Sequence, residues 1–255
     1  MLTAITRTVS PTLADCELSF IARAPIDVEK ATRQHQAYER LLERLGVRVI
    51  SLPAEPTMPD SMFVEDPALV LDELAVIFPL GSESRRREAP TVARALAPFR
   101  KLAFISLPAT VEGGDVLRVG HRLFVGLTRR TNAEGIRELT RILEPHNYEI
   151  HPVAVTGCLH LKSAVTCLGG NTLLANRAWF DAASLVAFEF VDVDPGEPHA
   201  GNALTVADTV IFPASFPKTR VILESRGFHV TAVDISELQK AESGLTCSSL
   251  LFDAP

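Results

Sequence analysis

The sequence predicts an α/β fold in which similar units close into a five-bladed α/β propeller, as a single domain over residues 1–255. Two short strands, an amphipathic helix and a lone strand recur along the chain, and the hairpins begin near residues 68, 115, 163, 203 and 245. The last unit is incomplete at the C-terminus, whereas a helix and a lone strand without a clear hairpin stand at the N-terminus. Together the two ends would supply the fifth blade.

The first two complete units are the clearest. In the first, ALVLD and LAVIF form a hairpin in residues 68–78, a helix is expected over residues 88–98, and LAFISL is the lone strand. In the second, DVLRV pairs with RLFVGL around Gly120 and His121. Thr131 and Glu134 then form a capping box that predicts a helix to about Leu143, and YEIHPVAV follows as a strand.

The next two units follow the same order. The third hairpin covers residues 163–176 and turns at two glycines, after which we expect a helix over residues 179–188 and the strand FEFVDV. The fourth pairs ALTV with TVIF. A helix over residues 218–226 then ends at Gly227, and FHVTAV is its lone strand.

The split fifth unit closes the ring. We expect a strand over residues 17–22, a helix over residues 27–45 capped by Gly46, the strand VRVISL, and a short apolar strand that contains Cys247. Closure removes the free sheet edges that invite aggregation. An open doubly wound sheet is the alternative, but it requires single strands between helices, and this sequence contains strand pairs.

Composition argues against two kinds of partner. The 25 basic and 31 acidic side chains give a net charge of −6 without a basic block, so no nucleic-acid partner is expected. No apolar run approaches the roughly 20 residues of a membrane span, and the N-terminus lacks a signal-peptide pattern, so we expect a cytoplasmic protein with no membrane partner. The wide spacing of its cysteines predicts reduced thiols and no metal site; they are Cys16, Cys158, Cys167 and Cys247.

A nucleophile and a proton carrier are the first elements of a candidate site. Cys247 follows Gly244 in GLTCSSLLF; a free cysteine there is ordinarily a packing residue, and a nucleophile needs a proton carrier and a route to the thiolate. His160 stands at the entrance to the third hairpin, where its side chain could point toward the ring axis. Helix capping or exposure to solvent is the alternative for His160.

Carboxylates cluster in two apolar segments. Asp60, Glu65 and Asp66 lie in PDSMFVEDPALVL, and Glu112 and Asp115 lie in TVEGGDVL. A carboxylate in such a setting must be paired, hydrated or hydrogen-bonded, and one that points into a pocket suits a guanidinium ligand. The alternative is that these side chains cap turns, particularly Asp115 beside its two glycines.

At these motifs the sequence resembles the dimethylarginine dimethylaminohydrolases, members of the guanidino-group-modifying superfamily, whose fold is a five-bladed α/β propeller, or pentein. The resemblance spans most of the chain and depends on an ordered set of segments. These are PDSMFVEDPALV, GSESRR, TVEGGDVL, FVGLTRRTNAEG, LHLKS and VDISELQKAESGLTCSSLLF.

The resemblance implies a role for each matching position. Cys247 would be the nucleophile, His160 the general acid and then base, and Glu112 a third catalytic residue that lies near the guanidinium with Asp66. The other implied substrate contacts are Glu65 and Phe63 in the pocket wall, Asp60 at the α-amine, Arg85 and Arg130 at the α-carboxylate, and Leu18 in a mobile loop over the pocket.

The activity implied by the resemblance is hydrolysis of asymmetric dimethylarginine or monomethylarginine to citrulline and an alkylamine. It would proceed through a covalent S-alkylthiouronium on the cysteine, with no metal or other cofactor. Two alternatives stay open: a hydrolase or deiminase of another guanidino compound such as arginine, and a non-catalytic module that binds a cationic ligand. Assembly as a homodimer is a further expectation.

Overall fold

The structure, a computed structural model, describes residues 1–254 and contains five three-stranded sheets. In every sheet the first strand pairs antiparallel with the middle strand, and the middle strand pairs parallel with the last. This is the predicted repeating unit. The sheets are β3 (Ala68–Val70), β4 (Leu74–Ile77) and β5 (Lys101–Phe104); β6 (Val116–Val119), β7 (Arg122–Leu127) and β8 (Glu149–Ala154); β9 (Val165–Gly169), β10 (Thr172–Ala175) and β11 (Glu189–Asp192); β12 (Leu204–Val206), β13 (Thr209–Pro213) and β14 (His229–Val233); and β15 (Leu250–Asp253), β1 (Leu2–Arg7) and β2 (Arg48–Leu52).

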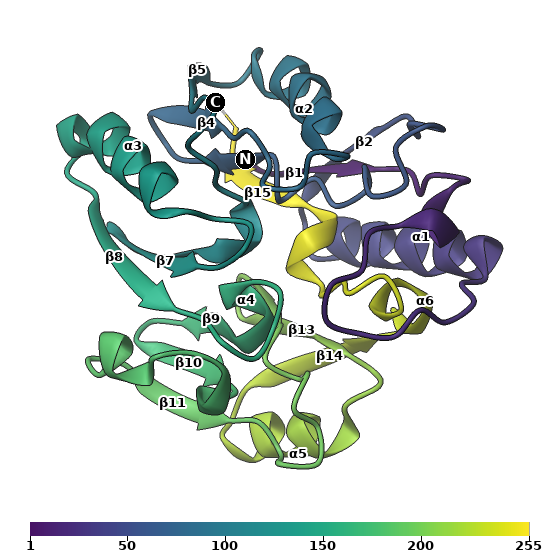
Figure 1. Ribbon diagram of the computed structural model, residues 1–255. Coiled ribbons are helices and arrows are strands. Elements are labelled where there is room, and N and C mark those ends of the chain that lie inside the picture. The colour runs from purple at the N-terminus through teal and green to yellow at the C-terminus, as the bar shows by residue number, and fades with distance from the viewer. Residues whose placement is uncertain (255) are drawn as a thin grey trace.

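The larger helices lie outside the ring that the sheets form (Figure 1). Asp27 begins the longest of them by accepting a hydrogen bond from the Lys30 N–H, and Gly46, with φ +82°, follows its end. No helix within residues 1–254 combines the length and the apolar character needed to cross a bilayer. The helices are α1 (Val28–Arg44), α2 (Ala89–Leu96), α3 (Ala133–Leu143), α4 (Leu161–Ala164), α5 (Pro217–Ser225) and α6 (Ser236–Gln239).

The two chain ends complete one sheet, as predicted. Ile5 of β1 stands opposite Leu250 of β15 on one side and Ile50 of β2 on the other. Strand β1 therefore takes the middle position that β4, β7, β10 and β13 hold in the other sheets. Both termini lie close together on this sheet (Figure 1).

The hydrophobic core lies between the sheets as well as beneath their helices. Five clusters of buried apolar side chains each join elements of two neighbouring units. One cluster, for example, packs Val116 and Val125 of the second sheet against Val76 and Leu74 of the first. Because burial of apolar area is the main stabilising term, each unit depends on its neighbours for stability.

Two predictions for the split unit are wrong. Residues 17–22 form no strand, because residues 2–7 take that place in the sheet. Cys247 does not lie within a strand either. It lies in a 3₁₀ turn, Thr246–Ser248, just before β15 begins at Leu250.

Two helix predictions also need correction. The expected helix over residues 179–188 is replaced by two 3₁₀ turns, because the side chains of Asn176 and Asp181 accept backbone hydrogen bonds and start a new turn each. The capping box at α3 is wrong as well. Asn132 is the N-cap and accepts from Gly135 N at 2.7 Å, whereas Thr131 Oγ1 accepts from the Glu112 N–H.

Candidate functional site

Most of the predicted site residues line one small cavity of about 20 Å³. They stand on the loops that enter or leave the strands, so the ring brings together segments that are far apart in the sequence. Five lining residues were not predicted, namely Glu17, Leu159, Ala241, Glu242 and Ser243. The predicted residues that line this cavity are Asp60, Phe63, Asp66, Arg85, Arg130, His160 and Cys247.

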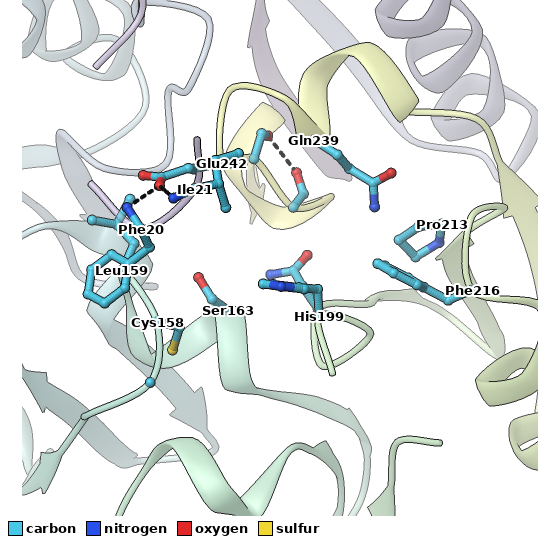
Figure 2. A pocket seen from close by; sticks show the side chains of 14 residues that line it. Phe20, Ile21, Cys158, Leu159, Ser163, His199, Pro213, Phe216, Gln239 and Glu242 are labelled. Carbon is cyan, nitrogen blue, oxygen red and sulfur yellow. Dashed lines mark hydrogen bonds between the residues drawn. The ribbon is translucent and has the colours of Figure 1, made fainter. Parts of the chain in front are cut away.

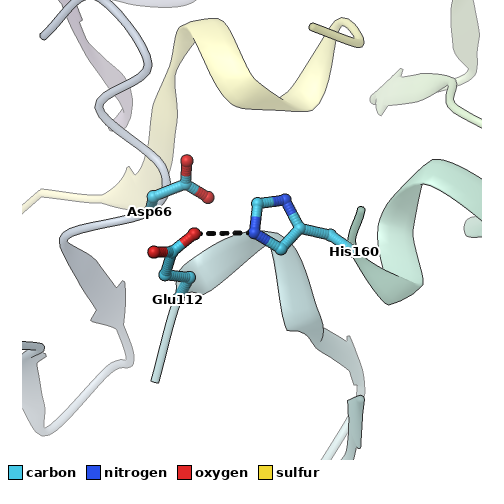
Figure 3. A group of neighbouring side chains, drawn as sticks. All are labelled: Asp66, Glu112 and His160. Atoms are coloured by element: carbon cyan, nitrogen blue, oxygen red, sulfur yellow. Dashed lines mark hydrogen bonds and ion pairs between the residues drawn. The ribbon is translucent and has the colours of Figure 1, made fainter. Parts of the chain in front are cut away.

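Asp66, Glu112 and His160 form a buried polar cluster beside the cavity (Figure 3). His160 Nε2 lies 2.7 Å from Glu112 Oε2. Asp66 accepts the Gly114 N–H with Oδ1 at 3.1 Å and Arg85 Nη1 with Oδ2 at 2.8 Å. Two carboxylates thus flank one imidazole.

The glycine pair of TVEGGDVL allows this close packing. A Cβ atom on Gly114 would lie 2.6 Å from His160 Nδ1 and 3.0 Å from Asp66 Oδ1, so any larger residue would displace the imidazole. A Cβ atom on Gly113 would lie 2.0 Å from the Glu65 carbonyl oxygen. The two glycines therefore let the backbone pass directly against the candidate catalytic side chains.

His160 is positively charged at neutral pH in this setting. Burial alone lowers the pKa of His160, but the charges of Asp66 and Asp115 and the hydrogen bond to Glu112 outweigh it and raise the pKa to about 9. Burial likewise opposes the charge on Glu112, yet the hydrogen bond with His160 leads the interactions that hold the Glu112 pKa well below its usual range. The pair is accordingly an ion pair with a proton available for donation.

A capping role was the alternative for both His160 and Asp115. The structure shows such a role for Asp115 but not for His160. His160 occupies the N-cap position of α4 without a side-chain capping bond. Asp115 accepts the Leu161 N–H at 3.0 Å and the Thr128 hydroxyl at 2.7 Å, and burial raises the pKa of Asp115 to about 6. Asp115 thus anchors the start of α4, and with it the backbone that carries His160.

The surroundings of Cys247 favour its protonated thiol. The residue is half-buried, and its Sγ accepts the Gly244 N–H at 3.4 Å. Burial, followed by the nearby charges of Glu65 and Asp66, raises the pKa of Cys247 to about 12. A cation placed beside Asp66 would neutralise part of that negative field and favour the thiolate.

The two predicted arginines are both buried and both paired with carboxylates. Arg85 donates two hydrogen bonds to Glu88, at 3.1 and 2.9 Å, besides its bond to Asp66. Arg130 Nη1 donates to Glu112 at 3.3 Å, and its Nη2 donates to Ser19 Oγ at 3.3 Å. Arg130 therefore connects the catalytic cluster with the loop of residues 17–22, while Arg85 is fixed mainly by Glu88.

Glu65 and Leu18 are not among the residues that line this cavity. Glu65 accepts the Thr246 hydroxyl at 2.8 Å and forms a partly buried ion pair with Lys162. It lines a separate cavity on the ring axis, which the first strands of all five sheets border. Leu18 is half-buried and packs on the apolar cluster beneath α1. Phe63 and Asp60 do line the site, and Asp60 Oδ2 accepts the Glu17 N–H at 3.2 Å.

The cluster of Asp66, Glu112 and His160 also has the spacing of a cation site, since their ligand atoms lie within 4.8 Å of one another. Each carboxylate, however, is already bonded to a cationic side chain of this protein. These ion pairs account for the close approach of the three groups.

Asn202 was not predicted from the sequence, and it connects the segment that carries Cys247 with the segment that carries His160. Its Oδ1 accepts the N–H groups of Leu245 and Thr246, at 2.7 and 3.1 Å, and its Nδ2 donates to the Lys162 carbonyl at 2.9 Å. A single buried amide thus holds the Cys247 turn against the helix that follows His160. One asparagine in a loop carries no pattern that would have revealed this.

We expect Asn202→Ala to lower kcat by about tenfold or more, because a small misplacement of reacting groups is costly. Stability should also fall, by about 1–3 kcal/mol, because buried N–H groups lose their acceptor. Asn176→Ala is the matched control, since Asn176 makes similar backbone contacts away from the site. Equal kcat in the two variants, measured well below their melting temperatures, would contradict a positioning role for Asn202.

The chain is similar in sequence to proteins of one described enzyme family. Residues 20–175 match the family model described as N,N dimethylarginine dimethylhydrolase, eukaryotic. The N(G),N(G)-dimethylarginine dimethylaminohydrolase of Pseudomonas aeruginosa is 37% identical over 97% of this chain and 98% of its own length. The protein of the same name from Streptomyces coelicolor is 36% identical over 97% of this chain and 95% of its own length.

Solved structures agree with these sequence relatives. A cysteine-to-serine mutant of the Pseudomonas aeruginosa protein, complexed with citrulline, superimposes with a TM-score of 0.91 at 36% identity over 98% of each chain. A histidine-to-glycine adduct of a dimethylarginine dimethylaminohydrolase with S-methyl-L-thiocitrulline also gives 0.91, at 36% identity over 98% of this chain and 99% of that one. The N-terminal domain of ArgZ, a cyanobacterial arginine dihydrolase, shares the fold at 20% identity, covers 100% of this chain and 98% of its own, and has a TM-score of 0.86.

Proposed function

The chain belongs to the dimethylarginine dimethylaminohydrolase family, and we propose that it hydrolyses asymmetric dimethylarginine and monomethylarginine to citrulline and an alkylamine. The observation that carries the proposal is the shared cavity of Cys247, His160, Asp66 and Arg130. It combines a thiol and a charged acid for chemistry at a guanidinium carbon, a carboxylate for the charge of that group, and a guanidinium for a substrate carboxylate.

The first step depends on the substrate's own charge. With its pKa near 12, the Cys247 thiol is almost fully protonated at neutral pH, and His160 is already protonated and does not act as its base. A guanidinium held by Asp66 lowers the thiol pKa, and the thiol proton leaves to solvent. The thiolate then attacks the central guanidino carbon, so an S–C bond forms and a tetrahedral adduct results.

His160 serves both halves of the cycle. It donates its proton to the methylated nitrogen of the adduct, the C–N bond breaks and the alkylamine leaves. The neutral imidazole then takes a proton from the water that attacks the remaining thiouronium carbon. The C–S bond breaks, the ureido group of citrulline is released and Cys247 is restored. Glu112 stabilises the charged form of His160 through their 2.7 Å contact.

The amino-acid end of the substrate is expected beside three charged residues of the cavity wall. Asp60 suits the α-ammonium group, and Arg85 and Arg130 suit the α-carboxylate. Arg85 donates to Glu88 and Asp66 at 2.8–3.1 Å, whereas the bonds that Arg130 donates to Glu112 and Ser19 are longer, at 3.3–3.5 Å, so Arg130 is the less tightly held of the two. Phe63 adds an apolar wall.

We expect Arg130→Ala to raise KM for asymmetric dimethylarginine by about tenfold to a hundredfold, because one charge-assisted contact is worth roughly 1.5–3 kcal/mol. A guanidine of the same length without the α-carboxylate should be nearly unaffected. The adjacent, exposed Arg129 provides the control Arg129→Ala. Equal losses for both substrates would show that Arg130 has a structural role.

Steady-state kinetics with identified products test the proposed activity. Asymmetric dimethylarginine should yield citrulline and dimethylamine in equal amounts, with a higher kcat/KM than arginine. A higher kcat/KM for arginine, with ammonia released, would instead assign the site to an arginine hydrolase or deiminase. Binding of these ligands without turnover, and without labelling of Cys247 by a haloamidine, would identify a binding module.

Cytoplasmic location and homodimer assembly stay predictions of this proposal. Light scattering of the purified protein distinguishes a monomer from a dimer. Fractionation of the source cells tests the location.

A further inference from the structure

The carboxylate of Glu242 holds the loop that borders the site. We call residues 17–22 the cover loop. Glu242 accepts the N–H groups of Ser19 at 2.9 Å and Ile21 at 2.7 Å, and also that of Phe20 between them. Figure 2 shows the Glu242 carboxylate beside Phe20 and Ile21. Three consecutive backbone N–H groups thus donate to one carboxylate, and hydrogen bonds to a carboxylate are stronger than those to a neutral acceptor.

The cover loop has few other attachments through its backbone. Within residues 1–254 it belongs to no helix or strand and makes no backbone–backbone hydrogen bond. Its one further backbone donor is Glu17 N–H, which donates to Asp60. Phe20 is 48% exposed, so apolar burial contributes little at the centre of the loop. Glu242 therefore receives three of the four hydrogen bonds that the backbone of this loop donates.

Glu242 adopts an unusual backbone conformation for a residue with a side chain. Its φ is +58°, a left-handed value that glycine adopts without strain and that glutamate rarely does. A glycine at this position would adopt the same backbone angles without strain. Because the position holds a glutamate instead, we attribute a function to its side chain. The contacts with Ser19, Phe20 and Ile21 are the function that the geometry offers.

The position of Glu242 connects the cover loop to substrate entry. Glu242 lines the cavity that contains Cys247, and it also lines a larger neighbouring cavity of about 330 Å³ (Figure 2). The catalytic cavity, at about 20 Å³, has room for little more than one water molecule. A ligand the size of an amino acid can enter only when a bordering segment moves, and the cover loop is a bordering segment that no backbone–backbone hydrogen bond holds.

We infer that Glu242 is the latch of the cover loop, holding it closed over the catalytic cavity by its three hydrogen bonds. The three hydrogen bonds are contacts within this chain and do not depend on which reaction it catalyses. Only the expected effect on turnover rests on the function proposed above. Ser19 and Glu17, which contact Arg130 and Ser82, place the same loop against the end of the cavity that we assign to the substrate carboxylate.

The test is amide hydrogen exchange of residues 17–22 in the full-length protein without substrate. In Glu242→Gly we expect exchange of this loop to accelerate at least about tenfold, because three charge-assisted hydrogen bonds are lost. The melting temperature should stay unchanged or rise, because glycine relieves the left-handed backbone. KM for asymmetric dimethylarginine should rise several-fold, with a smaller change in kcat.

Ala207→Gly is the matched control, because Ala207 also has a positive φ, +53°, and lies in the exposed β12–β13 turn. It should leave exchange of the cover loop unchanged. Glu242→Gln keeps one acceptor oxygen without the charge and serves if the glycine variant does not fold; several-fold faster exchange is expected. Unchanged loop exchange in whichever Glu242 variant folds overturns the latch. Failure of the proposed activity would appear in the kinetics alone, since exchange is measured without substrate.

Discussion

Cys247→Ser should abolish measurable turnover while the protein still folds and binds its substrate. A serine hydroxyl is far less acidic than a thiol, and the bound guanidinium cannot generate an alkoxide in the way that it favours a thiolate. The volume change is small at a half-buried turn, so the melting temperature should change little. Rate assays with asymmetric dimethylarginine, beside calorimetric binding of the same ligand, measure both properties.

Cys167→Ser is the control for this variant. Cys167 is also a half-buried free thiol, but it lies on β9 and borders the axial cavity instead of the site. It should keep nearly full activity. Retention of most of the rate by Cys247→Ser would contradict the nucleophile assignment.

His160→Gly should lose steady-state turnover by a factor on the order of 10² to 10⁴, the usual contribution of a positioned acid or base. Because the thiolate forms through the substrate's charge, the first covalent step should survive with a substrate whose leaving group needs no protonation. An adduct on Cys247 should then accumulate, since the base for its hydrolysis is missing. Normal turnover in this variant would contradict the role of His160.

The pH dependence of the wild-type enzyme follows from the same residue. The activity that needs protonated His160 should decline as pH rises through about 9. The folded-state pKa of His160 is raised above its ordinary value of 6.5, so its stabilising contribution is complete below pH 6.5 and is lost as pH rises through about 9. Thermal melts of the wild type and of His160→Gln should therefore converge in alkaline buffer. A constant difference across that range would contradict the ion pair with Glu112.

Sequence periodicity predicted the five units well because each hairpin, helix and lone strand has its own hydrophobic pattern. It failed for β1, where residues 2–7 form the strand, because the partner strand lies at the other end of the chain. It also failed at residues 179–188, where Asn176 and Asp181 restart the backbone as turns. A contact outside the local window thus decided the structure of β1, whereas local hydrogen bonds from side chain to backbone decided that of residues 179–188.

The candidate site shows a similar division. The motifs that carry the resemblance supplied Cys247, His160 and the carboxylates. Asn202 and Glu242 were missed. Their side chains accept hydrogen bonds from backbone N–H groups far away in the sequence, and no motif or spacing in the sequence marks such contacts. The resemblance also implied Glu65 in the pocket wall. Glu65 and Asp66 are neighbours in one turn, but Asp66 lines the catalytic cavity whereas Glu65 lines the axial cavity.

Covalent catalysis by Cys247 can be observed by mass analysis of the enzyme quenched with acid during turnover of asymmetric dimethylarginine. We expect a covalent adduct on the peptide that contains Cys247, with a mass increment equal to the substrate minus dimethylamine. This adduct should be converted to citrulline when turnover is allowed to continue. Citrulline formation without any adduct, or an adduct on Cys16, Cys158 or Cys167 in place of Cys247, would contradict covalent catalysis by Cys247.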